Sequence, residues 1–260
     1  MATRIGIAGI TGRMGLLLVE ETRAAGADLA GGIGRAGSGS GRPLPAGVER
    51  YPDIAALAAQ SDVVVDFTNA ATAQPHAAAL AHAGKAWVLG TSGLAAADEA
   101  AVAVAAERIP VVYASNFSPG VNLVLALAER MGAALPAEAY DAEIMEMHHR
   151  QKVDAPSGTA IGIGRAVAKG RGVVLDDVMQ SGRHGHTGAR PTGAIGFAAL
   201  RGGQVVGEHT LIFAAAAEQI ALTHRAFDRR VYATGAVRAA LWVAGRTPGL
   251  YSMMDVLGMA

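Results

Sequence analysis

The stretch Gly9-Ile10-Thr11-Gly12-Arg13-Met14-Gly15 decides the fold of the first half of the chain. An apolar strand is predicted over 4–8 before it, and a helix over 16–25 after it. Glycines here permit a tight turn and a close approach of the backbone to a pyrophosphate, which the helix N-terminus then faces. The spacing is G-x-x-G-x-x-G, with Thr11 where the commoner fingerprint has its second glycine. In this context the stretch predicts dinucleotide binding.

The second predicted strand, over 28–33, ends at Gly34-Arg35-Ala36-Gly37-Ser38. An acidic residue at this point usually binds the adenosine ribose hydroxyls of NAD, whereas an arginine accommodates the 2′-phosphate of NADP. Gly34 supplies no carboxylate and Arg35 supplies a cation, so we expect NADPH to be preferred and NADH to be possible. The alternative is that 34–41 is a glycine-serine loop in which Arg35 is solvated.

Alternating apolar strands and alanine-rich helices continue to about residue 113. The pattern predicts helices over 54–60, 71–83 and 95–107, and strands over 63–66, 86–89 and 111–113. Such alternation is typical of an α/β fold with a Rossmann-type, doubly wound parallel sheet.

Ligands of such sheets lie beyond the carboxyl ends of the strands. The segments that follow three of the strands are Phe67-Thr68-Asn69, Gly90-Thr91-Ser92-Gly93 and Ala114-Ser115-Asn116-Phe117. Their small and hydroxyl-bearing residues suit a floor for nicotinamide and ribose. The alternative is ordinary helix capping, because Thr, Ser and Asn are preferred N-cap residues.

The organisation changes near Gly120, where a second domain begins. We expect helices over 120–134 and 160–169 and strands over 140–148, 194–201, 204–213 and 218–224, with Gly202-Gly203 joining two strands as a hairpin. This predicts an α+β domain on a mixed sheet, whose exposed face must be covered. We therefore expect a homo-oligomer, a tetramer formed through this sheet.

The helix predicted over 229–245 should return to the first domain. The expected boundaries are 1–119, completed by 229–260, for dinucleotide binding, and 120–228 for substrate binding and oligomerisation. The polar segment 181–190 contains His184 and His186 two apart, but no carboxylate or third histidine accompanies them at a usual metal-ligand spacing. We expect no metal there, but a loop at a site rim or subunit interface.

Composition limits the classes of function. The chain has 260 residues, 51% of them hydrophobic, which is enough for real cores. Lys+Arg and Asp+Glu number 22 each, so no basic field favours nucleic acid. There is no cysteine for disulfides or thiolate chemistry, and no apolar run reaches the length of a membrane span. We expect a soluble cytoplasmic protein.

The stretch from Glu146 to Thr159, EMHHRQKVDAPSGT, concentrates the chemically able groups. His148 and His149 should point to opposite sides of a strand. Lys152 supplies a cation that can donate a proton, and Ser157-Gly158-Thr159 resembles a helix start whose N–H groups would bind a carboxylate. The mixture suits an anionic substrate that is protonated as it reacts. The alternative is a solvated basic turn.

The sequence resembles the 4-hydroxy-tetrahydrodipicolinate reductase (dihydrodipicolinate reductase) family over essentially its whole length. The stretches that carry this resemblance are 9–15, 66–68, 90–93, 115–118, 195–197, 207–210 and, above all, 146–159. The resemblance implies NAD(P)H-dependent reduction of 4-hydroxy-tetrahydrodipicolinate to tetrahydrodipicolinate with loss of water, in lysine and diaminopimelate biosynthesis.

The resemblance also implies roles for single residues. His148 would be the proton donor or acceptor and Lys152 a proton donor, with either supplying the proton, while His149, Gly158 and Thr159 would bind the dicarboxylate. The implied cofactor contacts are Gly9, Ile10, Thr11, Gly12, Arg13, Met14, Arg35, Gly90, Thr91, Ser92, Ala114, Ser115, Asn116 and Phe117.

Two positions depart from the family pattern. The family often has Glu before Arg at the end of the second strand, where Gly34 stands here, which disfavours NADH. It also often has a histidine where Gln151 stands, a change we expect to be tolerated. Two other functions compete with the reductase: a dinucleotide-binding sensor without turnover, and a reductase of another imine or keto acid. His148 and Lys152 argue against the first, and Lys152 with Ser157-Gly158-Thr159 against the second.

Overall fold

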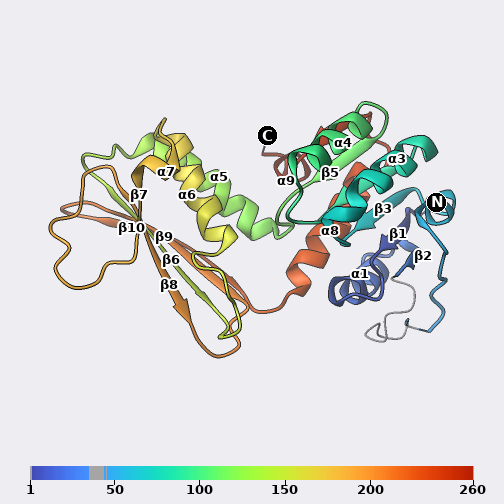
Figure 1. The fold of residues 1–260 in the computed structure, drawn as a ribbon, viewed down its shortest axis with the longest axis horizontal. Helices are drawn as coiled ribbons and strands as arrows, with labels where there is room; N and C mark the ends of the chain where they lie inside the picture. The colour runs from blue at the N-terminus through green and yellow to red at the C-terminus, as the bar shows by residue number, and fades with distance from the viewer. Residues whose placement is uncertain (1, 35–43, 45, 260) are drawn as a thin grey trace. The chain divides into compact units, whose positions relative to one another are not determined.

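The computed structural model describes residues 2–34, 44 and 46–259. The chain forms two compact units. Unit 1 comprises Met1–Pro119 and Arg230–Ala260, and unit 2 comprises Gly120–Arg229. The predicted combination of a doubly wound parallel sheet with a second α+β domain is confirmed (Figure 1).

Unit 1 contains a parallel sheet in the order β11-β5-β4-β3-β1-β2. Its strands are β1 (Arg4–Ala8), β2 (Asp28–Ile33), β3 (Val63–Asp66), β4 (Ala86–Leu89), β5 (Pro110–Tyr113) and β11 (Gly249–Tyr251). The chain runs outward from β1 in both directions, as a doubly wound fold requires. The edge strand β11, with only three residues, was not predicted.

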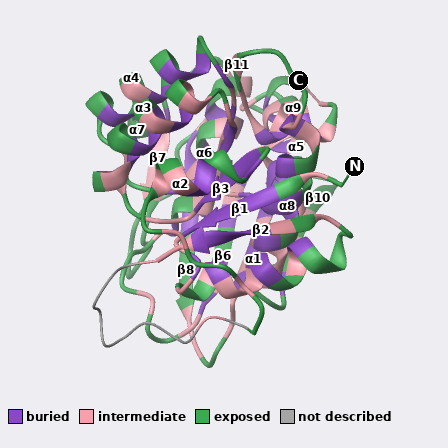
Figure 2. Cartoon of the chain, turned by 90° about the vertical axis from the view of Figure 1, so that its right-hand side faces the viewer, coloured by how far each residue is buried: buried purple, intermediate pink, exposed green. Residues whose placement is uncertain are grey.

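Helices cover both faces of this sheet. They are α1 (Arg13–Ala24), α2 (Ile54–Ala59), the 3-10 turn η1 (Ala70–Thr72), α3 (Ala73–Ala83), α4 (Ala96–Ala106), α8 (Arg230–Val243) and α9 (Met253–Leu257). Val63 and Val65 pack with α1, α8 and α9, whereas Val64 packs with α2, α3 and α4. Burial on both sides explains why the central strands are uniformly apolar, and Figure 2 shows β1 and β3 as buried.

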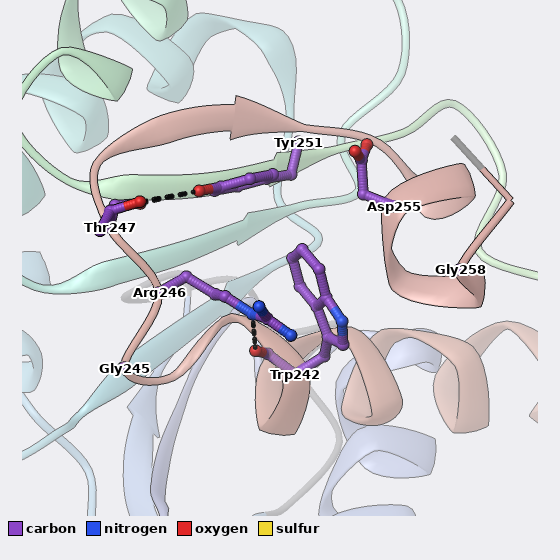
Figure 3. Close-up of a pocket in the computed structure, with 7 residues that line it drawn as sticks. All are labelled: Trp242, Gly245, Arg246, Thr247, Tyr251, Asp255 and Gly258. Atoms are coloured by element: carbon purple, nitrogen blue, oxygen red, sulfur yellow. Dashed lines mark hydrogen bonds between the residues drawn. The ribbon is translucent and has the colours of Figure 1, made fainter.

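The C-terminal segment belongs to unit 1. Arg230 at the start of α8 forms ion pairs with Glu20 and Glu21 of α1, at 2.6 and 2.8 Å. At the other end of α8, the Trp242 and Tyr251 rings meet edge to face at 5.2 Å, and the Arg246 guanidinium lies 4.2 Å from the Trp242 ring centre (Figure 3). These residues line a pocket of about 480 Å³ that contains none of the predicted cofactor contacts.

Unit 2 is built on a mixed sheet in the order β10-β9-β6-β8-β7. Its elements are α5 (Pro119–Ala134), β6 (Asp141–His148), α6 (Gly158–Gly170), α7 (Leu175–Val178), β7 (Met179–Ser181), β8 (Ile195–Arg201), β9 (Gly207–Ala214) and β10 (Gln219–Ala226). β6 is parallel to β8 and antiparallel to β9.

The hairpin predicted at Gly202-Gly203 is wrong. β6 lies between β8 and β9, so the two strands that this turn joins do not pair with each other. The turn passes around the end of β6 instead, where the Gly202 N–H donates to the His148 carbonyl at 2.9 Å. The hairpin of this sheet joins β9 and β10, closed by a bond from the Ala215 N–H to the Glu218 carbonyl.

The two faces of the mixed sheet differ. On the inner face, Ile144, Phe197 and Leu211 form a core with α5 and α6. On the outer face, Met145 and Leu200 are 43% and 47% exposed. Among the described residues, no helix is both long and apolar enough to cross a lipid bilayer.

The polar segment after β7 is tied to this outer face by ion pairs. Arg183 and Arg190 both contact the Glu143 carboxylate of β6, at 2.7 and 2.8 Å, and Arg190 also contacts Asp141. Gly196 opposite leaves room for that carboxylate, because a Cβ there would lie 2.0 Å from a Glu143 oxygen.

Candidate functional site

The inner face of β6 changes character along the strand. Ala142 and Ile144 belong to the apolar core, but the next two inward positions are Glu146 and His148, which are 1% and 9% exposed. A carboxylate is rarely this buried unless it is paired. Glu146 therefore needs partners within unit 2.

Both oxygens of Glu146 are fully used. Oε2 accepts from Arg201 Nη1 at 2.8 Å and lies 2.6 Å from His148 Nδ1. Oε1 accepts from Arg201 Nη2 at 2.8 Å and from the Ser157 N–H at 3.1 Å. Burial would raise the pKa of Glu146, but the bonds from Arg201, His148 and Ser157 outweigh it and hold the pKa below its ordinary value. Glu146 is therefore an anion that joins β6, β8 and the start of α6.

His209 of β9 is paired directly opposite Glu146 and completes this inner cluster. Its ring lies edge to face with the His148 ring at 5.1 Å, and its Nε2 is 3.0 Å from Ser157 Oγ. Burial, with the nearby His148, lowers the pKa of His209 to about 4. His209 is therefore neutral near neutral pH. His148 is the histidine of this face that contacts the Glu146 carboxylate.

Ser157 is the N-cap of α6, as the helix-start pattern indicates. Its Oγ accepts from the Ala160 N–H at 3.2 Å. Gly158 next to it is exposed, and a Cβ there would meet no atom within 4 Å. The backbone at Gly158 therefore presents the N-terminus of α6 to open space, where an anion is favoured, and Thr159 follows it in the first turn.

Lys152 lies in the loop between β6 and α6. Its Nζ donates to both oxygens of Asp154 at 2.8 Å, and its side chain is only 19% exposed. The contact with Lys152 lowers the pKa of the Asp154 carboxyl. Arg201 Nη2 fixes the same loop by donating to the Asp154 carbonyl at 2.6 Å. The ammonium is thus directed by its neighbour rather than fully solvated.

His149 follows the end of β6 and is half-buried. Its Nδ1 is buried and has no hydrogen-bond partner among the described residues. The predicted residues His148, His149, Lys152, Gly158 and Thr159 thus all come from the end of β6, the loop after it and the start of α6. Sequence reasoning gave no role to Glu146, Arg201 or His209.

In unit 1, the glycine turn is shaped by the backbone. Gly9 has φ +88°, and its N–H and that of Ile10 both donate to the Ile33 carbonyl, at 2.9 and 3.0 Å. Gly12 is the N-cap of α1, and a Cβ on Gly15 would lie 2.3 Å from the Gly9 oxygen. Only glycine lets α1 begin this close to the end of β1.

Phe67 brings three of the predicted cofactor segments together. A Cβ on Gly9 would lie 3.0 Å from the Phe67 carbonyl oxygen, and one on Gly90 would lie 2.3 Å from its ring. The Phe67 and Phe117 rings are 5.6 Å apart. The segments after β1, β3, β4 and β5 therefore meet at one edge of the sheet, where Thr91 Oγ1 is buried and has no partner among the described residues.

The remaining predicted contacts differ in exposure. Thr11 and Met14 are half-buried, Arg13, Ser92 and Ser115 are exposed, and the Asn116 side chain accepts from the Ser118 N–H at 2.8 Å. The segment that follows β3 is fixed at Asp66 by a buried pair, in which His76 Nδ1 lies 2.6 Å from Asp66 Oδ2. Thr68 donates to the other oxygen of Asp66.

Arg35 lies outside the described residues, so its predicted contact has no structural description. A side chain at Gly34 would require Thr11 to move, because a Cβ there would lie 2.8 Å from Thr11 Oγ1. Arg50, which the sequence reasoning missed, is exposed and donates to the Gly34 carbonyl at 3.4 Å. Its backbone bridges to Gly32 of β2, so Arg50 lies beside the end of this strand.

Two family models match the chain. The model described as dihydrodipicolinate reductase, N-terminus, matches residues 3–117, and the one described as dihydrodipicolinate reductase, C-terminus, matches residues 120–257. Together they cover both units.

Curated relatives match along the full length. A 4-hydroxy-tetrahydrodipicolinate reductase from Granulibacter bethesdensis is 69% identical over 256 residues, covering 98% of this chain and 97% of the relative. One of the same name from Acidiphilium cryptum is 65% identical, covering 98% of each.

Among solved structures, a dipicolinate-bound dihydrodipicolinate reductase from Paenisporosarcina sp. TG-14 superposes with a TM-score of 0.80 at 24% identity. The superposition covers 98% of this chain and 99% of the other. GenD2 from gentamicin A biosynthesis, in complex with NAD, reaches 0.61 at 16% identity over 99% and 91%. At these identities the superpositions establish the fold alone.

Proposed function

The chain belongs to the dihydrodipicolinate reductase family, and from this membership we propose that it reduces 4-hydroxy-tetrahydrodipicolinate to tetrahydrodipicolinate with a reduced pyridine nucleotide. Water is lost in the reaction, which serves lysine and diaminopimelate biosynthesis. The observation that carries the proposal is the 69% identity over 98% of the chain to a relative of that name.

The carboxyl edge of the sheet in unit 1 fits a dinucleotide. Glycines at 9, 12 and 15 leave the start of α1 open to a pyrophosphate. The Thr91 hydroxyl, which has no partner in the part of the chain that the structure describes, can bond to a ligand. When bound, the nucleotide supplies the hydride. The residues that would hold it are Gly9, Ile10, Thr11, Gly12, Arg13, Met14, Gly90, Thr91, Ser92, Ala114, Ser115, Asn116 and Phe117, with Arg35 from the sequence.

Unit 2 would hold the dicarboxylate and deliver the proton. The N–H groups at Gly158 and Thr159 and the side chain of His149 suit the carboxylates, while Lys152 neutralises charge as it develops. His148 or Lys152 supplies the proton to the atom that becomes negative, and a proton donor so placed typically contributes about 10²–10⁴-fold in rate.

We infer a preference for NADPH from the end of β2. Gly34 offers no carboxylate to bind the ribose hydroxyls or to repel a 2′-phosphate, and the exposed Arg50 lies beside the Gly34 carbonyl. Arg35 adds a second cation in the sequence. NADH remains a possible substrate, because neither arginine excludes it.

We also propose a homotetramer that functions in the cytoplasm. The outer face of the mixed sheet exposes Met145 and Leu200 beside small residues of β8, and apolar patches of this kind favour association. Sedimentation of the purified protein tests the oligomer number.

The activity is tested by following oxidation of NADPH and NADH separately. Dihydrodipicolinate synthase generates the unstable substrate in the same cuvette. We expect turnover with both nucleotides and faster turnover with NADPH. Preference for NADH would keep the reaction and overturn the cofactor argument. Binding of nucleotide without turnover would support the sensor, and turnover only with another imine or keto acid would change the substrate.

A further inference from the structure

We propose that Glu146 is a positioning residue, one buried carboxylate that fixes the proton-transfer face of His148 and the anion-binding start of α6 relative to each other. Arg201 keeps this carboxylate in place. The inference rests on the proposed function for the roles of His148 and α6, but the geometry it explains belongs to unit 2 alone.

The Oε2 atom of the carboxylate fixes the orientation and the tautomer of the His148 ring. Glu146 and His148 are two apart on β6, so both point to the inner face, and Oε2 lies 2.6 Å from His148 Nδ1. An ionised carboxylate only accepts hydrogen bonds, so Nδ1 carries a proton and Nε2 is left to exchange one with a substrate. Gly207 keeps that side open, because a Cβ there would lie 3.1 Å from Nε2.

The Oε1 atom of the carboxylate fixes the position of the first turn of α6. It accepts from the backbone N–H of Ser157, the N-cap of α6, at 3.1 Å. The carboxylate therefore orients the turn that presents Gly158 and Thr159. A neutral amide at this position has one acceptor oxygen and cannot serve both sides.

Arg201 makes the arrangement rigid. Its two terminal nitrogens each donate to one oxygen of Glu146, a bidentate pair that fixes the plane of the carboxylate. The same guanidinium donates to the carbonyls of Leu200 and Asp154, so it also anchors the loop that carries Lys152. The register places Arg201 opposite His148, on the neighbouring strand.

Charged and titratable groups surround His148 on every neighbouring element. They are Glu146 on the same strand, Arg201 on β8, the neutral His209 on β9, His224 on β10, and Lys152 with Asp154 in the loop. Glu146 is the carboxylate in contact with the ring, so Glu146→Gln removes the negative charge that touches the imidazole. Its removal should therefore move the pH dependence of any reaction in which His148 donates a proton.

The test compares Glu146→Gln with Val167→Ala in the full-length protein. Val167 is buried in α6 among apolar residues, so its truncation destabilises unit 2 without touching the carboxylate. We expect Glu146→Gln to lower kcat/KM about 10²-fold or more, by analogy with loss of the orienting carboxylate in a catalytic triad. The limb of the pH–rate profile that reports the proton donor should move to lower pH, while Val167→Ala leaves the profile unchanged.

A second measurement keeps the proposal open to failure if Glu146→Gln does not fold. Arg201→Lys retains the buried carboxylate but loses the bidentate pair. Nitrogen–proton NMR of labelled histidines should show the Nδ1-protonated form of His148 in the wild type and in Arg201→Lys, and a changed tautomer in any folded Glu146→Gln.

Two results would overturn the inference. One is that Glu146→Gln loses no more activity than Val167→Ala and keeps the pH–rate profile of the wild type. The other is wild-type protein in which His148 is protonated on Nε2 alone. If the wild type turns over no substrate, the proposed function fails, but the tautomer measurement still decides whether Glu146 positions His148.

Discussion

The two units build their candidate sites from different parts of the chain. In unit 1 the site is shaped by the backbone, since Gly9 adopts φ +88° and Gly15 leaves no space for a side chain. In unit 2 the site is shaped by buried side chains, where Glu146 joins His148, Arg201 and the backbone of Ser157.

This difference decides how each site should respond to change. A site formed by backbone atoms does not change with protonation, but it does not tolerate added side-chain atoms. A network around one buried carboxylate tolerates small changes of shape but depends on charge and on every partner. Substitutions in the two units therefore test the two halves of this contrast.

The largest effect is expected in the chemistry of unit 2. His148→Gln and Lys152→Ala should each lower kcat by about 10²–10⁴-fold, because each removes a group able to donate a proton. The Kd for the nucleotide should change by less than about twofold, since neither side chain belongs to unit 1. Steady-state kinetics and nucleotide titration by fluorescence measure the two quantities. A folded variant that loses nucleotide affinity would contradict the division of roles between the units.

The contrast also explains what the sequence could reveal. The glycine motif and the strands around it are contiguous in sequence, and four predicted strands, 4–8, 28–33, 63–66 and 86–89, have the observed bounds. The residues around Glu146 instead come from distant parts of the chain: Arg201 from β8, His209 from β9 and Ser157 from the N-cap of α6. The register of β6 with its neighbours brings Arg201 and His209 beside it. No local pattern marks Arg201 as a partner of Glu146.

The wrong hairpin has the same origin. Gly202-Gly203 does reverse the chain, but the pattern cannot show that β6, formed about fifty residues earlier, has inserted between β8 and β9. The three-residue strands β7 and β11 were missed because their length is too short for periodicity to register. The pairing of strands that are distant in sequence is therefore what could not be predicted from local patterns.

The second prediction concerns pH and the stability of unit 2. Because burial lowers the pKa of His209 to about 4 from its ordinary value of 6.5, the unfolded chain binds a proton between these values that the folded chain does not. Stability should therefore be full above pH 6.5 and fall as the pH drops towards 4, by roughly 3 kcal/mol from the 2.5-unit difference. Chemical denaturation at a series of pH values measures this.

The control is His209→Gln, which should remove most of that pH dependence. The rest belongs to His224 of β10, whose pKa burial also lowers. Glu146 affects only the lowest part of this window, because its pKa is lowered and its contribution is lost only below its ordinary value of 4.5. A His209→Gln protein that loses stability between pH 6.5 and 4 as steeply as the wild type would show that another group controls acid unfolding.

The third prediction sets one glycine of each unit against the other. Gly15→Ala should destabilise unit 1 by about 1–3 kcal/mol and weaken nucleotide binding, because its Cβ would lie 2.3 Å from the Gly9 carbonyl oxygen. Gly158→Ala should raise stability by up to about 1 kcal/mol, because its Cβ meets open space at the start of a helix. Thermal unfolding with and without nucleotide distinguishes them. Equal effects would mean that unit 2 also depends on its backbone.

The smallest effect is expected at the pair between Lys152 and Asp154, in which the carboxylate is exposed. Lys152 Nζ bonds to both oxygens of a carboxylate that is 57% exposed, so a substrate carboxylate must compete with Asp154 for the ammonium. Pairs this exposed contribute about 0.2–1 kcal/mol. Asp154→Asn should therefore lower KM for the dicarboxylate by up to about fivefold, with little change in kcat. The loop should keep its shape, because Arg201 bonds to the main-chain carbonyl of residue 154.

A matched control is Glu129→Gln, which removes the exposed partner of Lys169 between α5 and α6 and should leave KM unchanged. The KM difference for Asp154→Asn should shrink as salt is added, since screening weakens the competing ion pair. A rise in KM would mean that Asp154 orients Lys152 for the substrate rather than competing with it. In that case even this exposed loop would be positioned by side chains, and the contrast with the backbone site of unit 1 would be sharper than the buried network alone implies.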